Sequence, residues 1–551
     1  MIEPTEEEPL EPNTAVTPPI QNLSDNQSVV KAAAMLAVGN IASRVLGLAR
    51  EIVKSNLFGT SPLLAAYTVA ALVPMTLFNL ITGGEMVSSS LVPVFSDYAR
   101  KDRHAELWDV VSTFLSLAII ILLAIVGIVE LLTPQVAWLA GARNFDDPTL
   151  MPVTIDMMRL AAPAVLFLSA ASVITGVLYA LKRFTLPAFT GAVFNGTIVI
   201  VALLRPEHID SLVWGLLLGS LLQIVLQLPA LRDGRFRFQL NWHHPAVRRI
   251  IILYTPIVAG LVINQIAIWI SYNLAITTGD NAVTYMTYAT TLYQFPLGLV
   301  VTALSMATLP TLSQMATAYR EAKDTKQPDA PDKLHDYKST LSGGIRLALT
   351  LILPATAGLF ALATPIIGLL LEHGQFTPQD TAVTAQVLRY YLFGLPFAAI
   401  DQMLVFASYA RKDTWRPALA GVVSIAIYTV TAALLLNPLG LLSLMAADAA
   451  KHVVHTLIML WLLQRHLNGL PGYKIGITLG KSLLAAIITG LAAYAAASLA
   501  ALLPIVGFLQ KLVVVGAGST AGSVLFICMA LLLNMQEAKS MGKMVINRLR
   551  R

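Results

Sequence analysis

Charged residues are scarce in this 551-residue sequence, at 12% of the chain, whereas hydrophobic residues make up 56% and the mean hydropathy is +0.70. A soluble domain needs a charged and mixed surface, so this composition excludes one. The apolar runs, such as Leu115 to Leu132, are long enough for an α-helix to cross a ~30 Å hydrocarbon layer. They do not alternate as barrel strands would. The sequence therefore predicts an all-α integral membrane protein.

Cysteine is almost absent as well. Cys528 is the single cysteine, so the chain has no internal disulfide and no cysteine-based metal site. Its place in an apolar run predicts a role in helix packing. The sequence also lacks a Walker A motif, and its histidines do not have the spacing of a metal site. We therefore expect no cofactor, no metal and no enzymatic activity.

Apolar runs bounded by Gly, Pro or charge divide the chain into lobes and tails. They predict about fourteen transmembrane helices, at residues 30–57, 63–95, 107–132, 152–181, 185–204, 210–232, 246–275, 282–312, 340–370, 381–410, 415–437, 440–465, 478–503 and 508–534. The predicted units are a disordered acidic, Pro-rich tail (1–28), an N-lobe of six helices (29–233), a C-lobe of six helices (234–470), two extra helices (471–535) and a basic tail (536–551).

An internal repeat supports the two lobes. The stretch "YALKRFTLPA", which begins at Tyr179, matches "YARKDTWRPA", which begins at Tyr409. A second match joins "SSSLVPVFSDY" from Ser88 to "SMATLPTLSQM" from Ser305. The two copies of this second match are separated by fewer residues than those of the first match. A long charged loop between the two matching stretches of the second lobe accounts for the difference. Two six-helix units in the same orientation form a parallel repeat, and transporter sites lie between such repeats.

The formal net charge of +6 is explained by topology. Basic residues gather in alternate loops, for example at Lys182, Arg235 and Arg411, and the intervening loops hold few. By the positive-inside rule both termini are cytoplasmic. The basic loops then face anionic membrane lipids, and no nucleic-acid partner is expected.

The first predicted helix carries an unusual polar stripe. Its residues are spaced four and three apart, which places them on one helical face: Asn40, Arg44, Gly47, Glu51 and Lys54, flanked by Ser43 and Arg50. A charge near the bilayer centre costs roughly 2.5 to 3.5 kcal/mol, so the stripe cannot face lipid. One interpretation is a hydrated cavity in which Arg44 and Arg50 bind anionic substrate groups. The other is an ion-pair network that holds the helices together.

The second predicted helix is interrupted by polar and flexible residues. Glu85 lies there beside Gly83 and Gly84, with Pro74 and Pro93 on either side. Such a segment is tolerated where backbone lines a cavity or packs on protein, so we expect a hinge or gate. Glu85 is also a candidate ion-pair partner for Arg44.

A second group of polar residues falls in the predicted C-lobe. Asp448, Lys451, His452 and His455 follow one another on the twelfth helix, where Asp448 can pair with the residues three and four positions on. His titrates near neutral pH, so coupling of transport to protons is one interpretation, and a structural pair is the other. Asp401 on the tenth helix has no cation within a turn and is the remaining candidate for ion coupling.

The motif "SRVLGLARE" followed by "FG", together with "VPVF" and "YQFPLGLV", resembles the MurJ/MviN family of the multidrug/oligosaccharidyl-lipid/polysaccharide exporter superfamily. The resemblance covers roughly residues 30–535. It implies a flippase that carries lipid II, the undecaprenyl-pyrophosphate-linked peptidoglycan precursor, across the bacterial cytoplasmic membrane by alternating access around a cationic cavity. Ser43, Arg44 and Arg50 match the family's important serine and arginines, and Glu51 replaces its usual Asp. By this resemblance the substrate site contains Arg44 and Arg50, which would hold the pyrophosphate, and Ser43, which would add a hydrogen bond. Glu51 and Glu85 would set the position and release of the two arginines. The last two helices would form a groove for the lipid tail.

The sequence departs from the family pattern at several cavity positions. Residues without charge stand where family members have charged ones: Ala65, Phe78, Thr290, Thr291 and Gln294. No acid occurs in the seventh or eleventh predicted helix, where some members bind sodium. The alternatives left open are a flippase for another lipid-linked glycan, a small-molecule or drug antiporter of the same superfamily, and a scaffold for envelope biosynthesis proteins. A monomer is expected.

Overall fold

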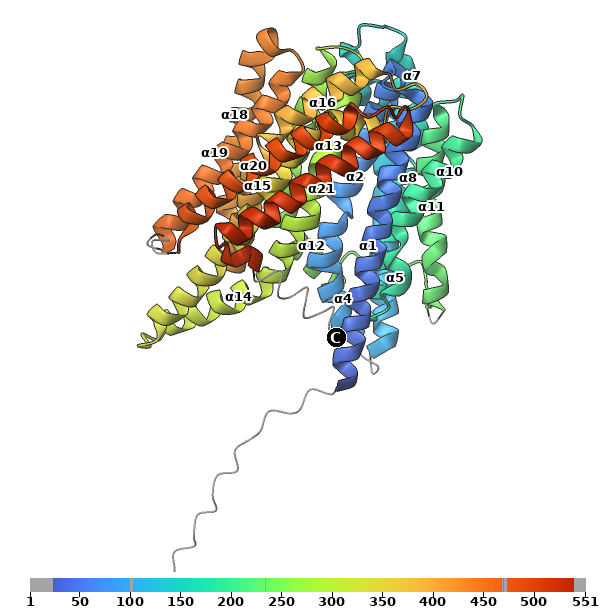
Figure 1. Cartoon of the computed structure of the whole chain (residues 1–551). Coiled ribbons are helices and arrows are strands. Elements are labelled where there is room, and N and C mark those ends of the chain that lie inside the picture. The colour runs from blue at the N-terminus through green and yellow to red at the C-terminus, as the bar shows by residue number, and fades with distance from the viewer. Residues whose placement is uncertain (1–22, 100–102, 233, 468, 470–472, 540–551) are drawn as a thin grey trace, which may run out of the picture.

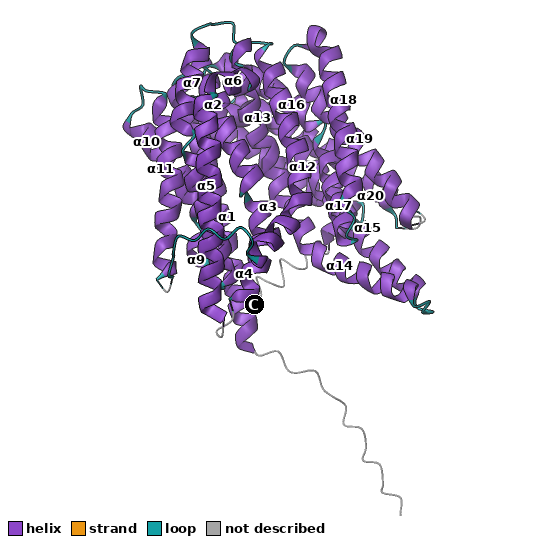
Figure 2. Ribbon diagram, turned by 180° about the vertical axis from the view of Figure 1, so that it is seen from behind, coloured by secondary structure: helices purple, strands orange, loops and turns teal. Residues whose placement is uncertain are grey.

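The computed structural model describes residues 23–99, 103–232, 234–467, 469 and 473–539. Within these ranges all regular elements are helices, as Figure 2 shows. The first half contains α1 (Leu23–Phe58), α2 (Pro62–Ile81), α3 (Gly84–Met86), a π-helical turn η1 (Val87–Leu91), α4 (Val92–Tyr98), α5 (His104–Leu131), α6 (Thr133–Leu139), η3 (Ala142–Asn144), α7 (Leu150–Ala161), α8 (Ala164–Ala180), α9 (Thr185–Ala188), α10 (Thr190–Leu204), α11 (Asp210–Gln227) and η4 (Leu228–Leu231).

The second half continues with long helices (Figure 1). These are α12 (Pro245–Ile276), α13 (Ala282–Pro296), a π-helical turn η5 (Leu297–Thr302), α14 (Ala303–Asp324), α15 (Ala330–Leu370), α16 (Pro378–Leu392), α17 (Leu395–Ala410), α18 (Trp415–Leu439), α19 (Leu442–Leu467), α20 (Ile475–Ala501) and α21 (Phe508–Leu532). The all-α membrane fold predicted from composition is confirmed.

Each predicted transmembrane range is helical, but not every one is long and apolar without interruption. Ten helical segments of the described chain meet that standard, and α16 with α17, bent by 44°, makes an eleventh. Helix α10 has 15 residues, α1 carries the charged stripe, and η5 interrupts the path from α13 to α14. The count of fourteen crossings therefore stays a prediction, compatible with this helix order.

The ends of the chain fall largely outside the described residues. This applies to residues 1–22 of the predicted acidic tail and to 540–551 of the basic tail. Helix α1 begins at Leu23, before the predicted start at residue 30.

The turns after α8 and α17 adopt the same backbone geometry. Lys182 and Lys412 have φ angles of 59° and 61°, in the left-handed region. In each turn the lysine amide donates to the tyrosine carbonyl three residues earlier, Tyr179 at 3.0 Å and Tyr409 at 2.8 Å. The two matching sequences that begin at these tyrosines thus fold alike, as a parallel repeat predicts.

Close contacts between helices set the position of α1. A Cβ atom on Gly39 would lie 2.2 Å from the Ala188 carbonyl oxygen, and one on Gly191 would lie 2.4 Å from the Ser43 hydroxyl. The absence of side chains here lets α1 pack directly on α9 and α10. These contacts fix how α1 is rotated against α9 and α10. Gly47 of the polar stripe also faces α10, since a Cβ atom there would lie 3.5 Å from Asn195 Nδ2.

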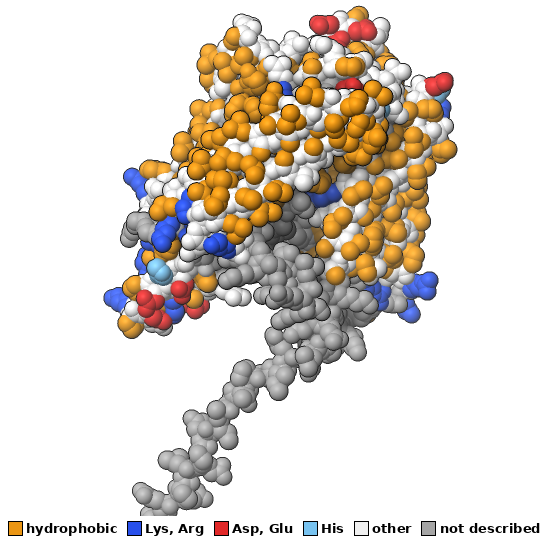
Figure 3. All heavy atoms as spheres, viewed as in Figure 1, with side chains coloured by type: hydrophobic (Ala, Val, Ile, Leu, Met, Phe, Trp, Pro, Cys, Tyr) orange, Lys and Arg blue, Asp and Glu red, His pale blue; other side chains and the backbone are white. Residues whose placement is uncertain are grey.

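Helices α20 and α21 pack on each other and on α15, and Figure 3 shows hydrophobic side chains gathered over their outer surface. Gly518 and Gly522 face α20, where a Cβ on Gly518 would lie 2.9 Å from the Ala493 carbonyl oxygen. This Gly-rich segment of α21 thus packs closely on α20. The prediction for Cys528 is wrong, because its side chain is exposed on the outer face of α21.

Candidate functional site

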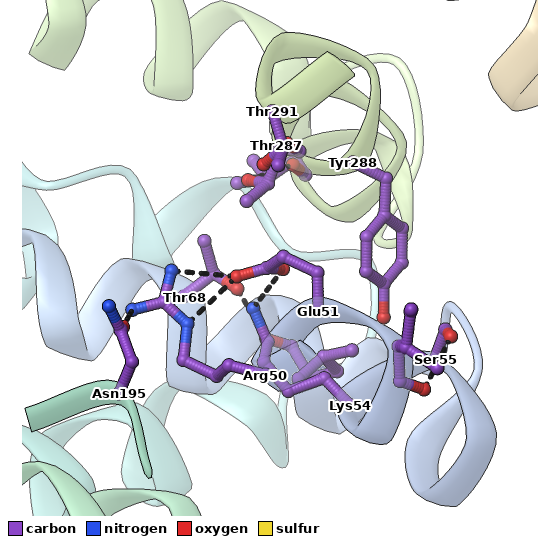
Figure 4. Close-up of polar contacts among 12 residues, drawn as sticks. Arg50, Glu51, Lys54, Ser55, Thr68, Asn195, Thr287, Tyr288 and Thr291 are labelled. Carbon is purple, nitrogen blue, oxygen red and sulfur yellow. Dashed lines mark hydrogen bonds and ion pairs between the residues drawn. The ribbon is translucent and has the colours of Figure 1, made fainter. Parts of the chain in front are cut away.

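Three charged residues of α1 form one ion-pair cluster (Figure 4). Glu51 accepts hydrogen bonds from Arg50 Nη2 at 2.8 Å and Nε at 3.0 Å through one oxygen, and from Lys54 Nζ at 2.8 Å through the other. The side chains of Glu51 and Lys54 are only 2% and 7% exposed, whereas that of Arg50 is 30% exposed. One carboxylate thus balances two cations, and the cluster keeps a net positive charge.

Residues from other helices complete this cluster. Asn195 on α10 accepts from Arg50 Nη1 at 3.0 Å, and its own amide donates to the Ser43 carbonyl at 3.2 Å. Lys54 Nζ lies 5.9 Å from the ring centroid of Tyr67 and 5.8 Å from that of Tyr288. Our sequence prediction did not include Asn195, although an amide within the apolar run of α10 was a signal that could have been used.

Arg44 and Arg50 line a cavity of about 700 Å³, and apolar residues of the last helices form much of its wall. Its other walls are the residues of α13, α15, α20 and α21: Thr291, Gln294, Phe295, Leu351, Leu359, Leu362, Ile366, Leu370, Thr489, Ala493, Gly518, Ser519, Gly522, Ser523 and Phe526 among them. The described lining contains no Asp or Glu. The cavity therefore combines two guanidinium groups at one end with a long apolar wall.

The guanidinium of Arg44 lies against the backbone of η5. A Cβ atom on Gly298 would be 2.6 Å from Arg44 Nη2, so a larger residue there would require the guanidinium to shift. Among the described residues Arg44 makes no ion pair. Its charge is consequently available to a bound anion.

The other predicted binding residues on α1 and α3 lie outside this cavity lining. The Ser43 hydroxyl faces Gly191 of α10, as described above. Glu85 is exposed on α3, and no described cation pairs with its carboxylate. The predicted ion pair between Glu85 and Arg44 is therefore not formed in this conformation. The break that precedes Glu85 is present, since α2 ends at Ile81 and the helix resumes at Gly84.

Two of the positions that depart from the family pattern line the cavity. Thr291 and Gln294 bring hydroxyl and amide groups to the α13 side of the cavity. Ala65, by contrast, is fully buried in α2. The positive charge of the cavity thus comes from α1 alone among the described residues that line it.

A clasp of hydrogen bonds joins the end of α1 to the segment between α15 and α16. Gln375 N donates to Asn56 O at 3.0 Å, and Thr60 Oγ1 donates to Asp380 Oδ1 at 2.6 Å. Gly374 has a φ of 55°, and a Cβ there would lie 2.2 Å from Asn56 O. The clasp connects the first helix of the predicted N-lobe with the predicted C-lobe.

The polar residues of α17 and α19 also meet in the interior. Asp401 Oδ1 lies 2.5 Å from His455 Nδ1, and Asp448 Oδ1 lies 2.5 Å from Lys451 Nζ. His452 Nε2 is 3.6 Å from the other Asp448 oxygen. Asp401 therefore has a partner, contrary to the isolation suggested by its own helix, because the partner comes from α19.

A family model described as "Lipid II flippase MurJ" matches residues 54–515 of this chain. The chain belongs to the MurJ family. The members of this family are flippases, so this chain is a multi-pass membrane transporter.

MurJ relatives match over most of their length. A "Lipid II flippase MurJ" from Burkholderia cenocepacia is 30% identical over 68% of this chain and 72% of that protein. A "Probable lipid II flippase MurJ" from Bdellovibrio bacteriovorus is 28% identical over 83% of this chain and 86% of that protein. The similarity thus includes both predicted lobes.

Solved structures agree in fold. One titled "Lipid II flippase MurJ, inward closed conformation" has a TM-score of 0.70 and 22% identity, and covers 91% of this chain and 98% of that chain. An inward-facing multidrug resistance MATE transporter has a TM-score of 0.62 at 14% identity and covers 80% of this chain and 98% of that chain.

Proposed function

We propose that this protein is a flippase that moves lipid II from the inner to the outer leaflet of the bacterial cytoplasmic membrane. The observation that carries the proposal is the cavity in which Arg44 and Arg50 stand at one end and α15, α20 and α21 supply an apolar wall. A pyrophosphate-linked lipid has these two parts, an anionic group and a long hydrocarbon chain. The cavity offers a surface to each.

Arg44 and Arg50 would bind the pyrophosphate. Guanidinium groups form paired, charge-assisted hydrogen bonds with phosphate oxygens, which offset the loss of water around an anion inside the membrane. Glu51 fixes Arg50 through one oxygen and Lys54 through the other, so Arg50 keeps part of its charge for the substrate. Arg44 has no ion-pair partner among the described residues, so a phosphate can bind it without displacing an acidic side chain.

Alternating access would then move the bound headgroup between the leaflets. The clasp formed by Asn56, Thr60, Gln375 and Asp380 closes the two lobes at one end and must open for release. Ser43 supports this role by packing α1 on α10, and Glu85 marks the break in the second helix at which it can bend. Both termini would be cytoplasmic.

Complementation with Arg44→Gln tests the proposal. In a bacterium depleted of its own lipid II flippase, the wild-type chain should restore growth and Arg44→Gln should fail at equal membrane level. Loss of one charge-assisted contact costs about 1.5 to 3 kcal/mol, or roughly 10- to 150-fold in binding. Arg232→Gln, which removes an exposed arginine from a loop, is the control. Full growth with Arg44→Gln would contradict the assignment of the cavity.

We further propose that the Asp401–His455 pair couples transport to protons. The charged or titratable groups near this pair are Lys451 and His452 on α19, Tyr293 on α13 and Tyr409 on α17. Asp448 on α19 is in turn paired with Lys451 and lies near His452. Asp401→Asn keeps the size and removes the titratable carboxylate. In vesicles, it should abolish the response of lipid II translocation to an imposed pH gradient and leave lipid II binding unchanged. An unaltered response would leave the pair with a structural role only.

A further inference from the structure

A second polar hollow is lined by the last turns of α14. Figure 1 shows that α14 ends on the side of the bundle where α1 begins. The hollow has a volume of about 520 Å³ and lies between α14, α15, the start of α18 and the last residue of α19. It shares no lining residue with the cavity of Arg44 and Arg50. The basic residues that line it are Arg320, Lys323, Arg411, Lys412 and Arg416. We call this hollow the basic pocket.

The basic pocket has more positive charge than its own acids balance. Its two acids are Asp324 and Asp413, and Asp413 is paired with Arg416 at 3.1 Å. Lys323, Arg411 and Lys412 make no ion pair with any described residue. The lining thus holds five basic residues against two acidic ones, and this surplus of positive charge raises the local attraction for an anion.

The walls of the pocket are fixed by hydrogen bonds. Arg320 Nη2 donates to the Arg411 carbonyl at 2.8 Å, which ties α14 to the turn before α18. Tyr337 on α15 is buried and donates to the Ala407 carbonyl at 2.9 Å. The cations therefore converge from separate helices on a preformed hollow, and do not simply project from one exposed helix.

An apolar path leaves the pocket along α18. Trp415 is 69% exposed at the start of this helix, and Leu419 and Val422 follow at helical spacing with 48% and 49% exposed. Trp is typical of the membrane–water interface, and basic pockets beside membrane helices bind anionic lipid headgroups. A free phosphate would use the cations but not this exposed apolar stripe.

We propose that the basic pocket binds the phosphate headgroup of an anionic phospholipid, whose acyl chain lies along Trp415, Leu419 and Val422. The lipid occupies the leaflet that faces this end of the bundle. It is a structural or regulatory ligand and is not the transported molecule. The site stands whether or not the cavity carries lipid II, because the two share no residues.

Native mass spectrometry of the full-length protein tests the proposal, with phosphatidylglycerol as the probe and phosphatidylcholine as the uncharged comparison. The variant Lys323→Gln/Arg411→Gln removes two cations that have no described ion-pair partner. The matched control, Arg232→Gln/Arg235→Gln, removes the same charge from an exposed loop. We expect the first variant to weaken the tightest phosphatidylglycerol binding roughly 10- to 30-fold and the control to leave it unchanged.

Two outcomes would overturn the proposal. Equal losses in both variants would mean that phosphatidylglycerol binds only through general surface charge. Full displacement by inorganic phosphate at a concentration similar to that of the lipid would identify a free phosphate site. Lys323→Gln alone, an exposed change on α14, repeats the test without altering the turn before α18, so a folding defect of the double variant does not decide the result.

Discussion

At the residue scale, Glu51 holds the cation cluster of α1 together. Glu51→Gln leaves Arg50 and Lys54 as like charges at a buried site, so we expect the stability of the folded protein to fall by about 3 to 5 kcal/mol. Thermal unfolding in lipid nanodiscs measures the change. Asp97→Asn removes an acid from an ion pair whose side chains are 57% and 50% exposed, and it should cost less than about 1 kcal/mol. Equal effects of the two substitutions would contradict a structural role for Glu51.

The contacts inside one helix were predictable from the sequence, and those between helices were not. Glu51 and Lys54 are three residues apart, so helical spacing alone predicts their pairing. Arg50 is the direct neighbour of Glu51, and its long side chain reaches back to the same carboxylate. Asn195 and Gly298 come from α10 and η5, and only packing brings them to Arg50 and Arg44. The same reason explains why Asp401 looked isolated until α19 supplied His455.

At the element scale, the packing of α21 on α20 shapes the apolar wall of the cavity. Gly518 and Gly516 lie two residues apart on α21, but a Cβ on Gly518 would be 2.6 Å from Leu362 Cδ2, whereas one on Gly516 meets nothing within 4 Å. Gly518→Val should therefore separate the helices, lower the thermal midpoint and weaken growth in the complementation assay. Overpacking of this kind typically costs about 1 to 3 kcal/mol.

Gly516→Val is the matched control for this element. It makes the same change on the same helix at an exposed position, so both the thermal midpoint and growth should remain near wild type. If both valine variants behave alike, the effect comes from helix propensity or insertion and not from packing on α15 and α20.

Helix positions were more predictable than interruptions within helices. Every segment that was predicted from a long apolar run is helical in the structure, and Gly83 and Gly84 indicated the break after α2. The π-helical turns η1 and η5 lie next to Pro93 and Pro296, but a proline does not by itself specify a π-helical turn. The turn also depends on how the backbone accommodates neighbouring helices. The bend between α16 and α17 likewise requires the packed structure.

At the scale of the whole molecule, the repeat and the charge pattern made the architecture predictable. The matching stretches that begin at Tyr179 and Tyr409 indicated two related lobes, and their turns at Lys182 and Lys412 share one geometry. Which lobe surfaces form the clasp could not be predicted, because Asn56 and Gln375 meet through their backbones. Backbone contacts leave little trace in side-chain patterns.

The orientation of the molecule in the membrane gives a prediction at the same scale. Helix α11 separates Glu207 from Arg235, both of which are exposed. Arg232, Arg235 and Arg237 follow the helix, so the positive-inside rule places its second end in the cytoplasm. In a Cys528→Ser background, an impermeant maleimide added to right-side-out vesicles should label Glu207→Cys at once, and should label Arg235→Cys only after permeabilisation.

The reverse labelling pattern would mean that the molecule has the opposite orientation in the membrane, and it would contradict the prediction that both termini are cytoplasmic. It would also move the basic pocket to the outer leaflet, because the predicted alternation of basic loops places Lys323, Arg411 and Arg235 on the same side of the membrane. Replacement of Cys528 is necessary, since its exposed thiol on α21 could otherwise react. One labelling experiment thus tests the orientation on which the direction of transport and the leaflet of the proposed phospholipid both depend.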